Sequence, residues 1–203
     1  MNIDYLQLGL ALCVGISLAA ACGFRVFVPL LAMALGVRYM GMGIDENLAW
    51  VGSDAAIVCL GAATVVEIFA YYIPVVDNLL DTITGPAAMI AGAFVAAGML
   101  GDLPDWAQWG TGIIAGAGAA GTVQLSTTAA RAGSTGTTAA VGNPIISTME
   151  NIFSVIGSAL AIFAPILAVI GAILLIFVTF IFLRKILSII RKKKAATAAT
   201  AAA

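Results

Sequence analysis

The chain has 203 residues and a formal net charge of −1; 62% of its residues are hydrophobic and only 9% are charged. This balance excludes the basic surface that nucleic-acid binding needs, and it exceeds the apolar content of a water-soluble domain. The apolar stretches are continuous, so we predict an all-α polytopic membrane protein and not a β-barrel. His is absent, and no catalytic residue or cofactor motif is visible. We therefore expect no enzyme and no cofactor, and whether a metal binds is left open.

About five spans are expected, together with apolar segments that carry charge. Residues 5–22 and 55–73 are long enough to cross a bilayer, whereas residues 24–37 contain Arg25 and follow a bend expected near Gly23. The other expected segments are a polar loop at 38–54, an amphipathic turn at 74–85, a third span at 86–101, a fourth at 107–122, a hydroxyl-rich segment at 125–151 and a last span at 153–183 with a kink at Pro165. The sequence leaves open whether residues 24–37 and 125–151 cross the membrane or re-enter it.

The end of the chain differs in composition from the rest. We predict a single transmembrane domain over residues 1–190 and a basic, Ala/Thr-rich tail over residues 191–203. The basic cluster RKILSIIRKKK predicts a cytoplasmic C-terminus in the cell inner (plasma) membrane, because cytoplasmic flanks are rich in Lys and Arg. The lipid bilayer is therefore the expected partner, and nucleic acid is not.

Two pairs of segments resemble each other in the same order. IPVVDNLLDTITGPAAMIAG (73–92) aligns with NPIISTMENIFSVIGSALAI (143–162), and GISLAAACGFR (15–25) aligns with GTVQLSTTAAR (121–131). We interpret them as a duplication of inverted topology, as in many transporters. The repeats would span residues 5–101 and 107–183. The alternative is chance similarity between segments rich in Ala and Gly.

Arg25 and Pro29 interrupt an apolar segment. A charged side chain at mid-bilayer costs about 2.5–3.5 kcal/mol on insertion scales, so it persists when it is paired, hydrated or near the interface. Pro29 has no N–H to bond the carbonyl of Arg25. Freed backbone is tolerated where it lines a cavity, so the pair predicts a re-entrant or broken helix around a polar site. The alternative is an arginine that reaches the interface with its long side chain.

A second arginine lies in the hydroxyl-rich segment. Thr127, Arg131, Ser134 and Thr138 fall at helical steps and predict one polar stripe on an Ala- and Gly-rich helix. Glu150 follows the turn at Asn143 and Pro144, and we expect it to fold back onto this stripe together with Asn151. The alternative is a solvent-exposed polar loop.

Acidic residues complete the candidate site. Glu67 lies within a span and is expected to face inward, and Asp77 and Asp81 are one helical turn apart, so they share a face. Neighbouring carboxylates favour a shared proton or a bound cation, although they could also cap a helix at the interface. The candidate substrate- or ion-binding residues are Arg25, Glu67, Asp77, Asp81, Arg131, Asn143 and Glu150, and structural breaks are expected at Pro29, Pro74, Pro86 and Pro144. The candidate binding residues include four acids and two arginines. This excess of two negative charges favours a cation or proton over an anion.

The segments SLAAACGFRVFVPLLA, IPVVDNLLDTITGPAAMIAG and AARAGSTGTTAAVGNPIISTMEN together resemble the bacterial membrane family called domain of unknown function 4126, over roughly residues 8–180. The resemblance implies a multi-span inner-membrane protein and no assigned activity. It also implies a shared polar core, formed by Arg25, Pro29, Asp77, Asp81, Pro86, Arg131, Asn143, Pro144 and Glu150. The segment PVVDNLLDTITGP lacks a histidine that we expect in many relatives, which argues against a mechanism that uses an imidazole.

Three functions are compatible with these residues. The first is a small transporter or channel for a cation or a proton-coupled solute. The second is a lipid-binding or lipid-translocating protein whose arginines grip a phosphate, by analogy with re-entrant-hairpin lipid transporters. The third is a non-catalytic subunit of a membrane complex. Gly112 and Gly116 have the GxxxG spacing that lets helices approach closely, within one chain or in a homo-oligomer.

Overall fold

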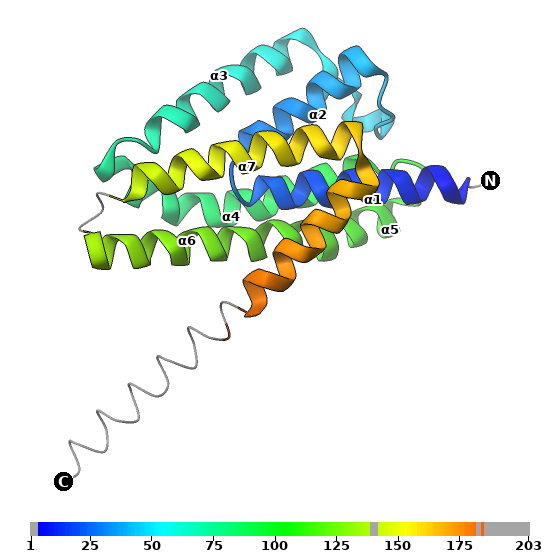
Figure 1. The fold of residues 1–203 in the computed structure, drawn as a ribbon. Helices are drawn as coiled ribbons and strands as arrows, with labels where there is room; N and C mark the ends of the chain where they lie inside the picture. Colours follow the sequence, from blue (N-terminus) through cyan, green and yellow to red (C-terminus); the bar gives the residue numbers. More distant parts are fainter. Residues whose placement is uncertain (1–3, 139–141, 182–183, 185–203) are drawn as a thin grey trace.

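The computed structural model describes residues 4–138, 142–181 and 184, and these residues form helices and no strand (Figure 1). The elements are α1 (Tyr5–Cys22), α2 (Phe27–Met40), the 3₁₀ helix η1 (Glu46–Gly52), α3 (Asp54–Ala70), α4 (Pro74–Gly98), α5 (Asp105–Thr111), the π-helix η2 (Gly112–Ala117), α6 (Gly118–Thr138) and α7 (Asn143–Phe163). A further helix spans Pro165–Ile181. The predicted tail at 191–203 and all of the basic cluster beyond Arg184 lie outside the described residues.

Three helices are long and apolar enough to cross a membrane: Tyr5–Cys22, Leu79–Gly98 and Asn143–Phe163. A fourth span results if η1 and α3, which are bent by 63° at a short break, are counted together. Two shorter apolar helices, α2 and Pro165–Ile181, add to these. The predicted all-α polytopic class is confirmed, and part of the apolar sequence lies in broken or short helices.

Many large apolar side chains cover the outside of the bundle, and polar side chains are buried inside it together with apolar ones. Val66 and Phe69 on α3 and Phe153 on α7 are exposed, whereas Arg25 and Glu150 are buried. Such an arrangement suits a lipid environment, in which apolar surface is well solvated and polar groups must find partners within the protein. The fold is therefore that of a protein surrounded by hydrocarbon.

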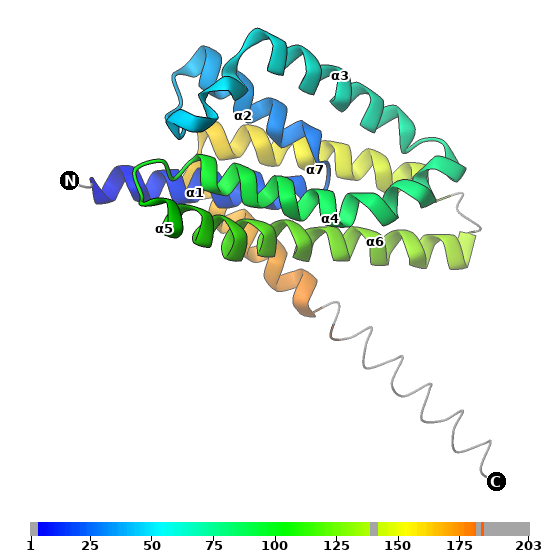
Figure 2. The same cartoon turned by 180° about the vertical axis from the view of Figure 1, so that it is seen from behind.

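The helices run alternately in opposite directions. Figures 1 and 2 show α1, α3 and α6 running one way and α2, α4 and α7 the other way. Helix α1 packs against α2, α4, α6 and α7 and is the central element. The segments that the sequence aligns, α1 with α6 and α4 with α7, run in the same direction. The inverted topology that we predicted is therefore not found, because α2 forms a complete helix that runs back alongside α1.

The predicted breaks are of three kinds. Helix α1 ends at Cys22, so the bend expected near Gly23 is confirmed. Pro74 and Pro144 lie in the first turns of α4 and α7, where a missing N–H costs nothing. Pro29 likewise lies in the first turn of α2 and interrupts no helix, whereas Pro86 lies inside α4, which continues through it.

The last expected span is divided in two. Helix α7 ends at Phe163, and Ala164 leaves the helical region before a new helix begins at Pro165. The residue before a proline is disfavoured in the α conformation, which explains the break. Figure 1 shows the chain turning sharply at this point.

Helices α4 and η2 approach each other closely through glycines. A Cβ on Gly116 would lie 2.4 Å from the carbonyl oxygen of Gly92, and one on Gly112 would lie 2.7 Å from that of Ala93. The GxxxG pair therefore packs within the chain. The π-helical turns of η2 lie at this contact. A π-helix has one more residue per hydrogen-bonded turn than an α-helix.

This contact predicts a stability difference between two neighbouring glycines. Gly116→Ala should lower the free energy of unfolding by about 1–3 kcal/mol, because the added methyl group overlaps the backbone of α4. Gly118→Ala is the control, since a Cβ there meets nothing within 4 Å. Thermal unfolding in detergent, followed by circular dichroism, measures both. Equal melting temperatures for the two variants would contradict the close approach.

Candidate functional site

Two buried arginines from distant parts of the chain meet at one tyrosine ring. The guanidinium carbon Cζ of Arg25 lies 3.8 Å from the ring centroid of Tyr71, and that of Arg131 lies 4.2 Å from it. Tyr71 follows the last residue of α3 and is 4% exposed. The π-face of a buried ring attracts cations, so Tyr71 partly compensates two guanidinium groups at once.

Glu150 lies between the two arginines and contacts both. Its Oε2 is 3.3 Å from NH2 of Arg25. Arg131 donates to Glu150 twice, from Nε to Oε1 at 3.0 Å and from NH2 to Oε2. This two-point contact is the geometry in which a guanidinium binds a carboxylate most strongly.

The remaining donor of Arg131 faces α4. NH1 donates to Oδ1 of Asp77 and lies 3.8 Å from Oδ1 of Asp81. The side chain of Asp77 is 1% exposed, whereas that of Asp81 is 16% exposed. We call the six residues Arg25, Tyr71, Asp77, Asp81, Arg131 and Glu150 the arginine cluster.

Arg25 also contacts the backbone and an amide of α7. Its Nε donates to Oδ1 of Asn151 at 2.5 Å, and its NH2 donates to the carbonyl oxygen of Ser147 at 3.1 Å. Its NH1 is buried and has no hydrogen-bond partner among the described residues. One donor at the centre of the cluster is thus left for a bound ligand or water.

Asn143 joins the cluster from the start of α7. Its Nδ2 donates to Oδ2 of Asp77 at 2.8 Å and to Thr135 at 3.3 Å. Its Oδ1 is buried and accepts no hydrogen bond within the described part of the chain. Asn143 therefore orients the carboxylate of Asp77 toward Arg131.

Glu67 has a different role from the one predicted. It is 7% exposed, so the inward orientation is right, but its carboxylate accepts from the backbone N–H groups of Val26 at 2.8 Å and Phe27 at 3.0 Å. These are among the N–H groups that the first turn of a helix leaves unpaired. A negative charge at this end of α2 also interacts favourably with the helix dipole. Glu67 therefore fixes the start of α2 and forms no ion pair with either arginine.

Helical spacing brings the predicted polar side chains together. The stripe of Thr127 and Arg131 lies on α6 and is buried, so this segment is a helix and not the exposed loop that we considered. Ser134 is half-buried on the same helix. The helix continues to Thr138, whose side chain lies outside the described parts of the structure.

In the two aligned segments, the arginine of each copy contacts residues of the other copy. The alignment matches Asp77 with Ser147 and Asp81 with Asn151. Arg131, from the second copy, lies against the first member of each pair, and Arg25, from the first copy, binds the second. A duplication would produce this exchange, and the crossed contacts support it, although the duplication stays a prediction.

The cluster lies within the bundle and not at its surface. Asp81 and Glu150 each lie seven residues after the first residue of α4 or α7. At 1.5 Å per residue this is about 10 Å along each helix. Among the described residues no group of three or more His, Cys, Asp and Glu side chains is placed to hold a metal ion. The acids are arranged around arginines instead.

Sequence reasoning missed part of the cluster. Tyr71 lies near the end of the span expected at 55–73, and nothing in its spacing indicates a contact with arginine. Ser147, one helical turn before Asn151, contacts Arg25 through its backbone carbonyl oxygen, which no side-chain pattern marks.

The fold and the cluster define an integral membrane protein of several apolar helices with a buried network of charged side chains. The family model described as Domain of unknown function (DUF4126) matches residues 12–185, and the chain belongs to this family. The predicted resemblance is therefore confirmed. No curated protein and no solved structure matches the chain.

The buried and exposed ion pairs of this chain should differ sharply in stability. Arg131→Gln should lower the free energy of unfolding by about 3–5 kcal/mol, because it leaves buried carboxylates without their partner. Arg38→Gln is the control: Arg38 and Asp54 form an exposed pair at 3.1 Å, and its loss should cost less than about 1 kcal/mol. Thermal unfolding in detergent compares the two variants. An Arg131 variant as stable as the Arg38 variant would contradict the network.

Proposed function

We propose that the protein is a small transporter or channel that moves a cation or a proton-coupled solute across the membrane. In this proposal the arginine cluster is the site that binds the ion. The protein would act as a conduit and not as an enzyme, in the cell inner membrane with its C-terminus in the cytoplasm.

The observation that carries the proposal is the charge balance around the arginines. Arg25 and Arg131 face the three carboxylates of Asp77, Asp81 and Glu150, and Glu67 lies nearby at the start of α2. Four acids against two bases leave an excess of negative charge in a buried site. Such an excess is reduced by a bound cation or a bound proton.

Asp81 is the acid best suited to bind that ion. Arg131 already donates to Asp77 and Glu150, so Asp81 lies at 3.8 Å, beyond hydrogen-bond distance. Its side chain is also more exposed than those of the other two acids of the cluster. Asp81 is thus only weakly paired with Arg131, and it is accessible from outside the cluster. An ion that must bind and then leave requires both properties.

Lipid binding is the second candidate, and one observation favours it. An apolar groove of about 330 Å³ lies between α1, α7 and the Pro165–Ile181 helix, lined by residues that include Phe24, Phe153 and Leu167. A groove of this character fits an acyl chain. The arginines support this candidate less well, because a lipid phosphate would have to replace Glu150 or Asp77.

The proposal predicts the behaviour of Asp81→Asn. In proteoliposomes that contain a pH-sensitive dye, a potassium diffusion potential set with valinomycin should drive proton entry through the wild-type protein. Asp81→Asn should lower the rate at least tenfold, because a neutral amide does not take up a proton and lacks the charge that attracts a cation. The same assay is repeated with sodium and potassium gradients to identify a cation other than the proton.

Asp54→Asn is the matched control, since Asp54 is exposed and pairs only with Arg38 among the charged residues described. It should transport at the wild-type rate. Wild-type flux in both Asp81→Asn and Arg131→Ala, with both proteins folded, would refute the arginine cluster as the ion-binding site, and a wild-type protein without any ion flux would refute transport. Phospholipid that co-purifies with the protein, without any ion flux, would favour the lipid-binding candidate instead.

A further inference from the structure

A row of buried hydroxyl groups continues from the arginine cluster along α7. Ser154 and Ser158 follow Glu150 at steps of four residues, so the three side chains share one face. Ser154 is fully buried and Ser158 is 2% exposed. The neighbouring helix α1 contributes Ser17, which is 4% exposed. Sequence analysis did not identify these serines as site residues.

The contacts between α1 and α7 define their register. The two helices are antiparallel (Figure 1). Arg25 lies level with Glu150, and one turn further along α7 the hydroxyl of Ser154 donates to the carbonyl oxygen of Ala21 at 3.3 Å. Each further turn of α7 must therefore match one turn back along α1.

This register brings Ser158 level with Ser17 and then Ala161 level with Val14. The hydroxyls of both serines are buried and have no hydrogen-bond partner among the described residues. A buried hydroxyl is normally paired, with protein or with water, because leaving it unpaired costs free energy. Two such hydroxyls in the same interface, at the same level, are suited to bind a water molecule.

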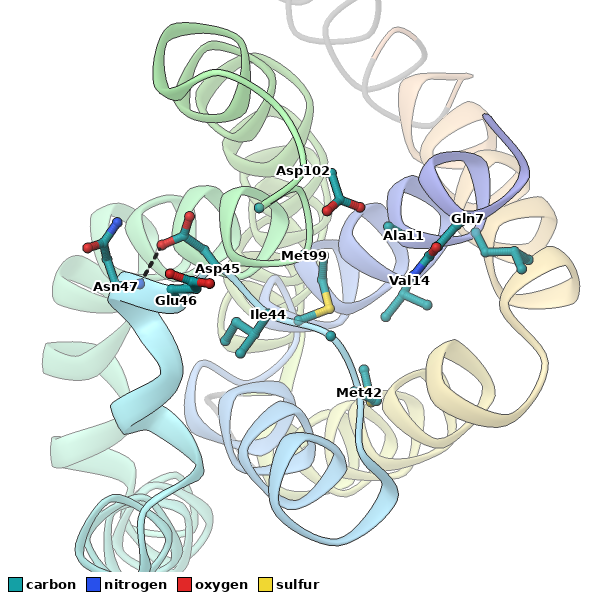
Figure 3. Close-up of a pocket in the computed structure, with 13 residues that line it drawn as sticks. Gln7, Ala11, Val14, Met42, Ile44, Asp45, Glu46, Asn47, Met99 and Asp102 are labelled. Carbon is teal, nitrogen blue, oxygen red and sulfur yellow. Dashed lines mark hydrogen bonds between the residues drawn. The ribbon is translucent and has the colours of Figure 1, made fainter. Parts of the chain in front are cut away.

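An acidic pocket lies at the other end of the bundle. It has a volume of about 510 Å³ and is lined by Gln7, Ala11 and Val14 of α1, by the segment that follows α2 and by the segment that follows α4. Figure 3 shows Asp45 and Glu46 together on one side of this pocket and Asp102 between them and Gln7. The pocket therefore attracts cations, and one of its lining residues, Val14, lies one helical turn from Ser17.

The pocket is a fixed feature of the fold. The backbone N–H of Asp45 donates to the carbonyl oxygen of Gly98 at 2.9 Å. A Cβ on Gly101 would lie 2.8 Å from the Cα of Asp45, so only glycine allows this approach. The segment that carries Asp45 is thus held against the end of α4, and its carboxylate has a defined place.

We propose that the transported ion is the proton and that it moves between the acidic pocket and the arginine cluster along Ser17, Ser158 and Ser154. This inference rests on the proposed function. A hydroxyl both donates and accepts a hydrogen bond, so it can receive a proton on one side and release one on the other. The proton comes from water in the pocket and is bound by a carboxylate of the cluster.

Val14 and Ala161 separate the pocket from the hydroxyl row. Both are buried and apolar, and both belong to the same hydrophobic core. A short apolar barrier between two polar regions excludes water most of the time and so limits conduction. The barrier would keep the proton path closed at rest.

The first test removes the hydroxyls. The double variant Ser17→Ala/Ser158→Ala should lower proton flux at least tenfold in the proteoliposome assay. It should melt at the wild-type temperature or above, because each substitution removes an unpaired buried polar group. Thr64→Val is the control: its hydroxyl is buried on α3 and bonds the carbonyl of Leu60 at 2.8 Å in its own helix. It should leave the flux unchanged.

The second test opens the barrier. Val14→Thr keeps the side-chain shape and adds a hydroxyl, so it should raise proton flux several-fold without releasing a fluorescent dye trapped in the vesicles. A loss of fold cannot produce this gain.

The outcomes separate the two proposals. Wild-type flux in the serine variant and in Val14→Thr, with flux abolished in Asp81→Asn, overturns the proton path and leaves the proposed function standing. Wild-type flux in Asp81→Asn and Arg131→Ala overturns the arginine cluster as the ion-binding site, and with it the end point of the path. A wild-type protein that moves no protons overturns the path, and sodium or potassium flux in that protein would keep the proposed function.

Discussion

Glu150 binds both buried arginines, and the packing of the helix ends around Arg25 and Arg131 depends on this one carboxylate. Removing two guanidinium groups from water costs several kcal/mol each unless they find charge and hydrogen bonds nearby. Glu150 contacts Arg25 on one side and Arg131 on the other, while Tyr71 lies against both. The turn between α1 and α2, the end of α3 and helices α6 and α7 therefore meet at one point. Asp77 and Asp81 add α4 to this contact.

The broken first helix follows from the same constraint. Arg25 can reach Glu150 only if α1 ends beside α7, and α1 ends at Cys22. The chain must then start a second helix inside the bundle, where unpaired N–H groups are costly. Glu67 supplies acceptors for Val26 and Phe27. The two acids thus have separate roles. Glu150 compensates the charge of the arginines, and Glu67 accepts hydrogen bonds from backbone N–H groups.

That six of the seven candidate residues lie close together could be predicted from the sequence, because charge inside an apolar chain is conspicuous. Arg25, Asp77, Asp81, Arg131, Asn143 and Glu150 all lie in one network. Glu67 was recognised as inward-facing, but its partners are backbone groups that no sequence pattern marks. Whether the network binds an ion stays a prediction.

Other features could not be predicted, for identifiable reasons. The direction of the repeats depends on whether α2 forms a complete helix, and Arg25 together with Pro29 indicated an incomplete one. Tyr71 lies after an aromatic-rich end of α3, which is also typical of residues at a membrane interface. Serines such as those at positions 17, 154 and 158 are common in packed membrane helices. That the hydroxyls of Ser17 and Ser158 have no hydrogen-bond partner among the described residues becomes visible only in three dimensions.

A double-mutant cycle between Asp77 and Arg131 tests the central claim most directly. The variants Asp77→Leu, Arg131→Met and the combination are unfolded thermally in the same detergent, and the free energies are compared. We predict a coupling energy of at least about 2 kcal/mol, with the double variant more stable than Arg131→Met, because the second substitution removes a carboxylate that Arg131→Met leaves buried without its partner. Additive losses, with no coupling between the two positions, would contradict the account.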